Sequence, residues 1–437
     1  MTSFTRDSYW LQNAPTPRME SVELPPRAEV AILGAGIMGS ATAYWLARAG
    51  QRPVVLERNP GPAQGATGRN GGLHVTGPAR DYAEAVQAQG RAAAQEIVRA
   101  TFLNQELLEE VLAREDIDAD YRRTGFMSLA ASADERALMQ ASVRLLQADG
   151  FPAEWLDRPA AIEKLGTPLA PEFVGALFKS NDAVLHSARY TLGVAEAALR
   201  RGARFAFSTS VVRVEPGPAG RGWAVHTSRG LLMAEQLVVT LNAWADEVFP
   251  ELERVLTPVR GHIVLTAPVE FRLTPWSANQ GYEYGRQLEN GHLLIGGMRH
   301  VRADMDRGHR PAPGGNVPEV QPEVVQALSE YAPRLFPATA GVPVVHHWTG
   351  MMDFSPDHNP LAGRWPGREG LWLLVGLSGH GMPYSLVLPR AIAAQVTGVE
   401  GPIIPTAFDP ARFLTVVHSL HDHIFGAPRD PHFPPHP

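Results

Sequence analysis

Residues 28–39 read AEVAILGAGIMG, and this stretch decides the fold. Its first six residues form a short apolar run of the kind found in buried parallel strands. A glycine turn follows, and the segment 37–49 is predicted to be a helix that ends at a glycine. A second apolar run, PVVLE at 53–57, comes directly afterwards. The stretch therefore predicts a strand, a helix and a second strand parallel to the first, the βαβ unit.

The glycines of this turn have the spacing of the dinucleotide-binding fingerprint GxGxxG. Gly34 permits the tight turn, Gly36 lets the backbone approach a pyrophosphate, and Gly39 lets helix and strand pack closely. The helix N-terminus offers free N–H groups and a partial positive charge to the phosphates. Glu57 ends the second strand, where its carboxylate can accept hydrogen bonds from ribose hydroxyls. The alternative, an ordinary glycine turn between strand and helix, is disfavoured by this full context.

A second glycine-rich segment, GATGRNGG at 65–72, lies soon after Glu57. So many glycines at this point suggest that the backbone packs against a large planar ligand. Glu57 alone does not separate FAD from NAD, whereas this segment favours FAD. The alternative is a flexible surface loop.

The rest of the chain mixes two patterns. Helices are expected at 81–114, 133–149, 190–202, 321–334 and about 381–397, strands at 125–130, 204–215, 222–227, 236–241 and 371–376, and antiparallel sheet over 256–300. Parallel-type βαβ pieces at both ends with antiparallel material between them predict a mixed α/β (α+β) fold. In it, a substrate domain built on an antiparallel or mixed sheet is inserted into a discontinuous, Rossmann-type FAD-binding domain.

The expected boundaries follow from these patterns. The FAD-binding domain would take 28–115, 165–255 and 345–415, and the substrate-binding domain 116–164 and 256–344. Residues 1–27 would form an N-terminal extension and 416–437 a C-terminal tail, which is Pro-rich from 427.

Composition excludes several classes of protein. The chain has 437 residues and a formal charge of -6, without the basic footprint that nucleic acid requires. It has no cysteine, which excludes disulfides, thiolate nucleophiles and iron–sulfur clusters. Only Lys164 and Lys179 could supply an amine for Schiff-base chemistry. We find no apolar run near the roughly 20 residues that span a bilayer and no signal peptide, so a cytoplasmic protein is expected.

The chain resembles the D-amino-acid-oxidase superfamily of FAD-dependent oxidoreductases, which includes sarcosine and glycine oxidases. The similarity is greatest to the gamma-glutamylputrescine oxidase-like branch. The motifs that carry the resemblance run in the same order along nearly the whole chain: SYW at 8–10, GAGIMG at 34–39, GATGRNGG at 65–72, LNAWA at 241–245, PVRG at 258–261, LLIGG at 293–297, WTG at 348–350, SPDHNPLAG at 355–363, GLSGHG at 376–381 and FDPARF at 408–413.

The resemblance implies that FAD lies extended through the first domain, with its flavin ring at the domain interface under the inserted sheet. Val212 would contact the adenine through its backbone, and 379–381 would place a helix N-terminus near the pyrimidine end of the flavin, which becomes anionic on reduction. The full set of expected FAD contacts is Gly34, Gly36, Ile37, Met38, Gly39, Glu57, Arg58, Gly65, Ala66, Thr67, Arg69, Asn70, Gly71, Gly72, Val212, Asn242, Gly350, Gly379, His380, Gly381 and Met382.

Three features depart from the family. Sarcosine oxidases link their flavin to a cysteine, and this chain has none. They also carry an oxygen-activating lysine in the strand where this chain has Leu294. Glycine and D-amino-acid oxidases have a carboxylate-binding arginine soon after the Trp-x-Gly motif, which is expected to form a turn, and Met351 and Met352 follow Gly350 at that place here. The last departure favours an amine or an N-substituted amino acid over a simple α-amino acid.

The implied reaction is oxidation of a C–N bond by hydride transfer to flavin N5, followed by hydrolysis of the iminium product. Oxygen, giving hydrogen peroxide, or another acceptor would reoxidise the flavin. Candidate catalytic residues come from the expected inserted sheet: Tyr282 and Tyr284, which alternate with Arg286 on one strand; Arg260 and His262, which share another face; and His347, beside His346 before the Trp-x-Gly motif. For each, packing in the sheet is the alternative.

No metal is expected. His418, His421 and His423 match no metal-binding spacing, and Asp357 is interpreted first as a turn former. Two other functions remain open. One is an FAD-dependent dehydrogenase of a 2-hydroxy acid or polyol that passes electrons to a quinone. The other is a flavin-binding subunit or redox sensor without catalysis.

Overall fold

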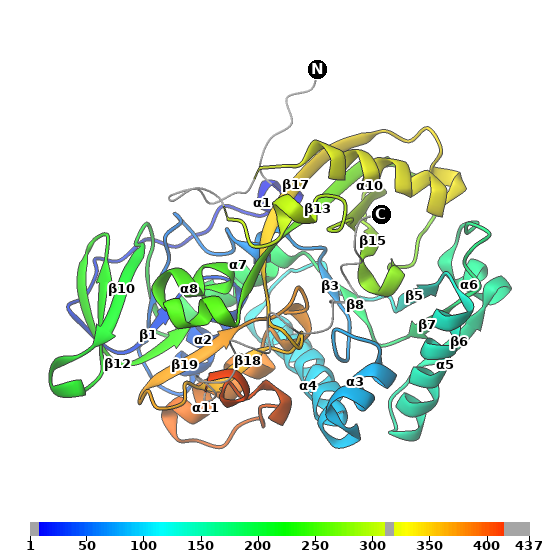
Figure 1. The fold of residues 1–437 in the computed structure, drawn as a ribbon. Helices are drawn as coiled ribbons and strands as arrows, with labels where there is room; N and C mark the ends of the chain where they lie inside the picture. Colours follow the sequence, from blue (N-terminus) through cyan, green and yellow to red (C-terminus); the bar gives the residue numbers. More distant parts are fainter. Residues whose placement is uncertain (1–7, 311–318, 415–437) are drawn as a thin grey trace.

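The first sheet grows from the βαβ unit at the start of the chain (Figure 1). The computed structural model describes residues 8–310 and 319–414, so the three histidines at 418, 421 and 423 lie outside the described residues. Parallel pairing joins β1 to β2 and β12, β2 to β9, and β12 to β19. The strands of this sheet are β1 (Arg27–Leu33), β2 (Val54–Leu56), β9 (Arg204–Ala206), β10 (Val211–Pro216), β11 (Trp223–Thr227), β12 (Gly230–Val239), β18 (Leu361–Arg364) and β19 (Leu371–Val375).

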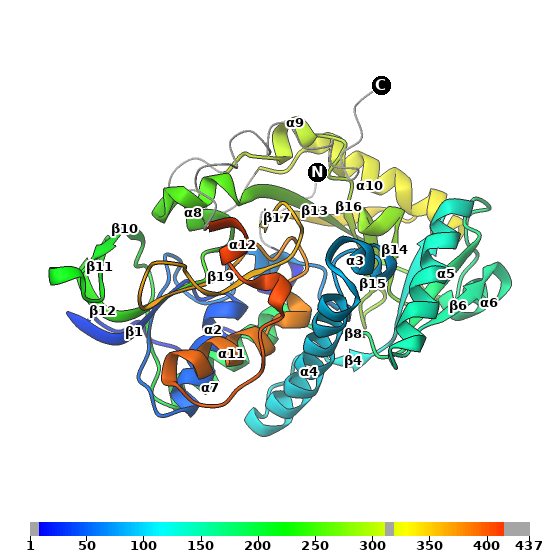
Figure 2. The ribbon, with the colours of Figure 1, turned by 60° about the horizontal axis from the view of Figure 1, so that its bottom comes forward.

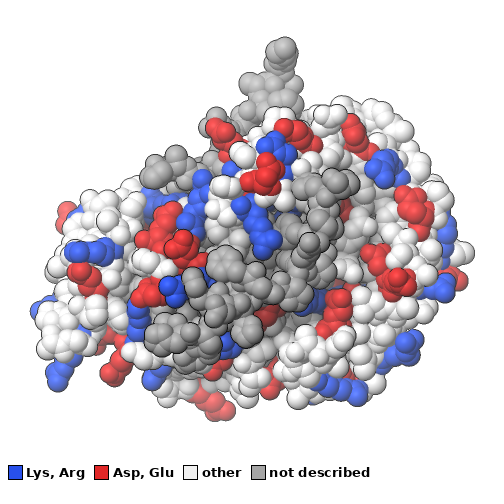
Figure 3. Space-filling model, in the orientation of Figure 1, with Lys and Arg blue, Asp and Glu red and all other residues white. Residues whose placement is uncertain are grey.

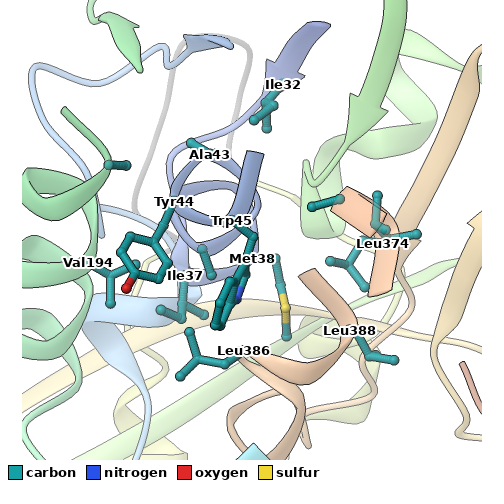
Figure 4. Packing of buried hydrophobic residues seen from close by; sticks show 14 of the residues in the cluster. Ile32, Ile37, Met38, Ala43, Tyr44, Trp45, Val194, Leu374, Leu386 and Leu388 are labelled. Atoms are coloured by element: carbon teal, nitrogen blue, oxygen red, sulfur yellow. The ribbon is translucent and has the colours of Figure 1, made fainter. Parts of the chain in front are cut away.

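Helices cover this sheet and create its core. Helix α2 (Ile37–Arg48) is buried from Ile37 to Ala47, because α7 (Ser187–Arg200), α11 (Val387–Thr397) and the sheet surround it. Figure 4 shows Tyr44 of α2 beside Val194 of α7, and Trp45 pointing towards Leu386. A helix buried on all sides must be apolar around its whole circumference, and IMGSATAYWLA meets that demand.

The second sheet is mostly antiparallel, in the order β17-β13-β16-β15-β14-β5-β7-β6. Its long neighbours β13 and β17 pair antiparallel over most of their length, and one parallel contact joins β14 to β5. Its strands are β5 (Phe126–Ala130), β6 (Glu154–Asp157), β7 (Gly175–Lys179), β13 (Thr257–Pro268), β14 (Trp276–Ala278), β15 (Glu283–Gln287), β16 (His292–Gly297) and β17 (Val344–Phe354). Helix α10 (Pro322–Leu335) packs on β13 and β16.

A helical layer and a small sheet complete the described chain. Figure 2 shows α3 (Tyr82–Gln89) and the long α4 (Arg91–Glu115) between the first sheet and α5 (Ala133–Ala148). The small sheet joins β3 (Leu73–His74), β8 (Ala183–Val184) and β4 (Arg122–Arg123). The shorter helices are α1 (Tyr9–Gln12), α6 (Arg158–Leu165), α8 (Ala245–Val248), α9 (Ala303–Asp306) and α12 (Ala411–Leu414).

The mixed fold confirms the predicted fold class, with four local corrections. The segment 204–215 is two strands, β9 and β10, rather than one. The Trp-x-Gly motif lies inside β17 and makes no turn. The helix expected from about 381 is a 3₁₀ turn at Met382–Tyr384 followed by α11, which begins at Val387. Finally, β7 and nearly all of β17 fall in ranges assigned to the FAD-binding domain, yet both strands belong to the second sheet.

Charged residues are mixed over the face drawn in Figure 3, where lysines and arginines alternate with aspartates and glutamates. Within residues 8–310 and 319–414, no helix has both the length and the apolar character to cross a membrane.

Candidate active site

The fingerprint turn has the strained and crowded backbone that only glycine permits. Gly34 has φ +99°, in the region that favours glycine. A methyl group added at Gly39 would lie 1.9 Å from the carbonyl oxygen of Gly34 and 2.8 Å from Oγ1 of Thr240. The close approach of α2 to β1 and β12 therefore requires Gly39, as the fingerprint predicts. The N-terminus of α2 begins directly after Gly36, where a pyrophosphate would be bound.

Glu57 is held in place at the end of β2. Its Oε2 accepts a hydrogen bond from the N–H of Ala35 at 2.8 Å, and its Oε1 accepts from the N–H and Nδ2 of Asn59 at 2.8 and 2.7 Å. The carboxylate is thereby fixed beside the glycine turn, where the fingerprint motif predicts a ribose-binding acid. Its neighbour Arg58 stacks on Trp244, with Cζ 4.2 Å from the ring centroid.

The glycine-rich segment 65–72 is gripped by two tryptophans from distant parts of the chain. Nε1 of Trp348 donates to the carbonyl of Arg69 at 2.9 Å, and Nε1 of Trp10 donates to the carbonyl of Asn70 at 2.5 Å. The segment is therefore ordered, and the alternative of a flexible surface loop is wrong. Thr67 Oγ1 accepts from the N–H of Ile37 at 3.1 Å, which ties the segment to the start of α2.

A cavity of about 360 Å³ lies against this segment. One wall consists of residues predicted to contact FAD: Ile37, Ala66, Thr67, Arg69, Asn70, Gly71, Asn242, Gly350, Gly379, His380, Gly381 and Met382. The facing wall includes Gly261 and Ile263 of β13, Tyr284 of β15, and Met352 and Phe354 of β17. The first group comes from the glycine segment, the first sheet's loops and Gly350 of β17, and the second from the second sheet. We call this space the main cavity.

The loop after β19 closes one end of the main cavity. Asp353 of β17 is buried, and its carboxylate accepts from the N–H of Gly376 at 2.5 Å and of Leu377 at 3.2 Å. Burial raises the pKa of Asp353 to about 6 against the opposing effect of these N–H donors. Within the described residues, the N–H groups of Gly379 and Gly381 have no hydrogen-bond acceptor. They are therefore available to an acceptor in the cavity, although a 3₁₀ turn and not α11 follows them.

His380 is a neutral part of this wall. Its Nε2 lies 2.9 Å from the carbonyl oxygen of Gly77, to which it donates. Burial lowers the pKa of His380 to about 4, so the ring carries no charge at neutral pH.

Tyr284 is the one predicted catalytic residue that the structure brings to the main cavity. A methyl group added at Gly71 would lie 2.9 Å from its ring, so Tyr284 packs directly on the glycine segment. Arg286 lies on the same face, buried, and its Nη1 donates to the carbonyls of Gly72 and Leu185 at 2.8 and 2.9 Å. Tyr282 precedes β15 and does not line the cavity.

Arg260, His262 and His347 are corrections to the predicted catalytic set. The cavity is lined by Gly261, Ile263 and Gly350, so these three side chains lie on the opposite face of the sheet. Asp306 accounts for the first two: it lies 3.5 Å from Nη1 of Arg260 and 3.0 Å from Nε2 of His262. Alternation correctly predicted that Arg260 and His262 share one face of their strand, but the sequence does not show which face of the sheet is turned to the ligand.

Val212 occupies an irregular position in β10. The pairing with β11 shifts register between Val211 and Arg213, which leaves Val212 in a bulge with an exposed side chain. Since a bulge frees backbone groups from the ladder, this geometry suits the expected backbone contact with adenine.

Several polar residues of the main cavity were not predicted: Arg80, Asp81, Glu84, Lys179 and Arg299. Burial, with a smaller effect of Glu84, raises the pKa of Asp81 to about 6. Nζ of Lys179 donates to the carbonyl of Thr76 and lies 3.2 Å from Oδ2 of Asp182. The scarcity of lysine was the only sequence signal that singled out Lys179.

The geometry of these residues fits FAD. Four features carry this fit: the turn at Gly34–Gly39, the fixed carboxylate of Glu57, the glycine segment 65–72 beside the main cavity, and the free N–H groups of Gly379 and Gly381. We call these residues together the FAD strip. Within residues 8–310 and 319–414, no group of three or more histidines and carboxylates could hold a metal ion.

Comparison with known proteins also indicates an FAD-binding protein. Residues 29–395 match the family DAO, described as FAD dependent oxidoreductase. Gamma-glutamylputrescine oxidoreductase of Escherichia coli is 26% identical over 85% of this chain and 84% of its own length. Glycine oxidase of Pseudomonas putida is also 26% identical, over 87% of this chain and 98% of its own length.

Solved structures with a similar fold include a glycine oxidase. The crystal structure of glycine oxidase from Geobacillus kaustophilus superposes with a TM-score of 0.73 at 24% identity, covering 88% of this chain and 98% of that one. The family match covers most of the chain, both sheets included. This chain is therefore a member of the DAO family of FAD-dependent oxidoreductases.

Proposed function

We propose that this protein oxidises a C–N bond of a small amine or of an N-substituted amino acid and delivers the electrons to oxygen, giving hydrogen peroxide. The observation that carries the proposal is the main cavity: its one wall is the FAD strip, and its other wall is an apolar face of the second sheet. A substrate in this space would lie between the cofactor and Tyr284, Met352 and Phe354. Relatives named for glycine and for gamma-glutamylputrescine support an amine or amino acid as substrate.

The protein's own part in the reaction is to bind, orient and exclude water. When bound, FAD would supply the acceptor for the two electrons and the hydrogen that leave the carbon next to nitrogen. The apolar wall, with Ile263 and Met352, favours the neutral amine, whose lone pair can assist that departure. Free N–H groups at Gly379 and Gly381 would stabilise negative charge that develops at the pyrimidine end of the ring.

The second sheet bears on substrate choice through Met352. The thioether of Met352 has no hydrogen-bond donor to offer a carboxylate. The position where glycine and D-amino-acid oxidases carry an arginine therefore cannot bind a substrate carboxylate here. We therefore infer that glycine and D-alanine are poor substrates, and that an amine whose nitrogen carries a second carbon substituent is preferred.

The test is anaerobic reduction of the purified, FAD-loaded protein by a panel of compounds, followed by flavin absorbance. The panel contains polyamines, N-methyl amino acids, glycine, D-alanine, D-lactate and glycerol. We expect fast bleaching by at least one amine or N-methyl amino acid, at least tenfold slower bleaching by glycine and D-alanine, and hydrogen peroxide on admission of air. Bleaching by the hydroxy compounds alone would establish the quinone-linked dehydrogenase instead. A flavin that no compound reduces would support a non-catalytic subunit.

A further inference from the structure

We propose that Arg299 binds an anionic group of the substrate, so that the preferred amine carries a carboxylate remote from the reacting carbon. The inference rests on the proposed function and names the substrate class within it. Arg299 follows β16 at the end of the second sheet and lines the main cavity.

Two aromatic rings hold the guanidinium in place. Cζ of Arg299 lies 5.2 Å from the ring centroid of Tyr282 and 5.5 Å from that of Phe354. Cation–π contacts of this kind fix the planar group while leaving its N–H donors free to form hydrogen bonds. Tyr282 therefore contributes to the site from behind Arg299, although it does not itself line the cavity.

The charge of Arg299 lacks an anionic partner within the described part of the chain. None of the described carboxylates forms an ion pair with it, and its buried Nε has no hydrogen-bond acceptor. The charge of Arg299 lowers the pKa of Glu283, against the larger effect of burial, but the two groups do not pair. Oε2 of Glu283 accepts a hydrogen bond from Nδ2 of Asn279 at 2.5 Å, while its buried Oε1 has no hydrogen-bond donor within the described residues. A cation at a cavity wall with unsatisfied donors is a binding site for an anion.

Arg299 is connected to the FAD strip through Phe354. A methyl group added at Gly379 would lie 3.2 Å from Sδ of Met352 and 3.6 Å from Cζ of Phe354. Phe354 thus contacts the loop at the pyrimidine end of the expected flavin position on one side and Arg299 on the other.

The other charges of the cavity wall are of both signs: Asp81, Glu84 and Asp353 carry carboxyl groups, and Arg80 and Lys179 carry cations. Arg80 also lines the cavity and has a buried Nε without an acceptor in the described residues. Lys179 is already neutralised by Asp182. An amino acid whose nitrogen is oxidised away from its carboxylate brings a negative charge that complements Arg80 and Arg299.

The experiment compares wild type with Arg299→Met and Arg299→Lys in the FAD-loaded protein. Methionine keeps an unbranched apolar stem and removes the charge, while lysine keeps the charge and loses the planar, forked set of N–H donors. Arg302→Met is the matched control, because Arg302 is in the same segment but pairs with Asp304 and Glu323 outside the cavity. Two measurements are made. The first is binding of propionate, a carboxylate without nitrogen that is not a substrate, followed by its perturbation of the flavin spectrum. The second is anaerobic reduction of the flavin by N-methyl amino acids and by their methyl esters.

We expect propionate to perturb the wild-type spectrum, and Arg299→Met to raise its dissociation constant 10- to 100-fold. Arg299→Lys should raise it less, and Arg302→Met should leave it unchanged. For the acids, the apparent dissociation constant should rise in Arg299→Met while the limiting rate of reduction stays within about threefold; the esters should lose less than twofold.

Equal effects of Arg299→Met on acids and esters, or a wild-type spectrum that propionate does not change, would overturn the role of Arg299. Because the propionate titration needs no turnover, it tests Arg299 even if no amine reduces the flavin. In that case the proposed function fails and the anion site is judged separately.

Discussion

Asp353 shows how one buried carboxyl group couples the second sheet to the loop that closes the main cavity. It is 1% exposed, and its side chain accepts the N–H groups of Gly376 and Leu377 while its own carbonyl accepts that of Ser378. Burial costs the ionised form more than these hydrogen bonds return, which is why the pKa rises to about 6 from 3.8.

The raised pKa of Asp353 predicts a specific pH dependence of stability. The folded protein binds the proton more tightly than the unfolded chain does, so this group's contribution to the free energy of unfolding falls as pH rises from about 4 to about 6 and is constant above. The side chain of asparagine does not titrate in this range, so Asp353→Asn lacks this contribution. Wild type should therefore lose about 1 kcal/mol relative to Asp353→Asn between pH 5 and pH 7, measured by urea unfolding.

The control for this prediction is Asp304→Asn. Asp304 is exposed, and its hydrogen bond with Arg302 lowers its pKa, so its titration is complete below pH 5. Its stability curve should run parallel to that of wild type between pH 5 and pH 7. A parallel curve for Asp353→Asn as well would show that Asp353 is already ionised at pH 5.

At the scale of elements, helix α1 fastens the glycine segment 65–72 from outside. Ser8 caps this helix, and its hydroxyl donates to the carbonyl of Gly68, while Trp10 donates to that of Asn70. Trp348 of β17 donates to the carbonyl of Arg69, which lies between these two residues, at 2.9 Å. The short motif at 8–10 thus belongs to the cofactor site by its contacts, although it precedes the first strand.

Trp10→Phe should weaken FAD binding more than it weakens the fold. The phenyl ring keeps most of the packing but loses the hydrogen bond to Asn70, which costs about 1 kcal/mol of stability and leaves a carbonyl of the FAD strip unrestrained. We expect a three- to tenfold higher dissociation constant for FAD, measured by flavin fluorescence on titration of the apoprotein. Trp372→Phe is the matched control, since buried Trp372 also loses one hydrogen bond, to Gln236 at 3.0 Å, but far from the strip. Equal losses of FAD affinity in both variants would contradict the role of α1.

The second sheet shows what could be predicted from sequence and what could not. The period of two correctly placed Arg260 and His262 on one face of β13, because alternation is a property of the strand itself. Which face meets the cofactor depends on how the sheet packs against another part of the chain, and that information is absent from the strand's own residues. The smaller Gly261 and Ile263 line the cavity instead. By contrast, the fingerprint residues were predicted individually, since turn, helix start and acid all lie within 30 residues of each other.

At the scale of the whole molecule, the predicted domain ranges depend on contacts between distant parts of the chain, which local sequence patterns do not show. β7 and β17 join the second sheet through pairings with β5, β6 and β13, which lie from about 20 to about 90 residues away along the chain. Local patterns do not encode such partners. The main cavity between the two sheets is equally non-local, and Arg299, Arg80 and Asp353 became candidates only when the structure placed them on its walls or against its closing loop.

Arg286 of β15, like Trp348 of β17, joins the second sheet directly to the glycine segment 65–72. It is buried, donates to Gly72 and Leu185, and lies 5.6 Å from the ring centroid of Trp10. Burial lowers its pKa to about 9, which marks the cost of holding a cation there without a carboxylate. That cost, several kcal/mol, is of the same order as the two hydrogen bonds to a charged donor, about 1.5–3 kcal/mol each.

Arg286→Met should therefore separate stability from cofactor binding. Because the opposing contributions nearly cancel, we expect the free energy of unfolding of the apoprotein to change by no more than about 1 kcal/mol. The carbonyl of Gly72 loses its link to β15, so FAD affinity should fall about tenfold and amide hydrogen exchange over 66–72 should accelerate. Arg213→Met, which removes an exposed cation paired with Glu215 at 3.0 Å, should change neither quantity. If Arg286→Met bound FAD as tightly as wild type, packing and the remaining hydrogen bonds of the segment, among them those from Ser8, Trp10 and Trp348, would be sufficient to hold it.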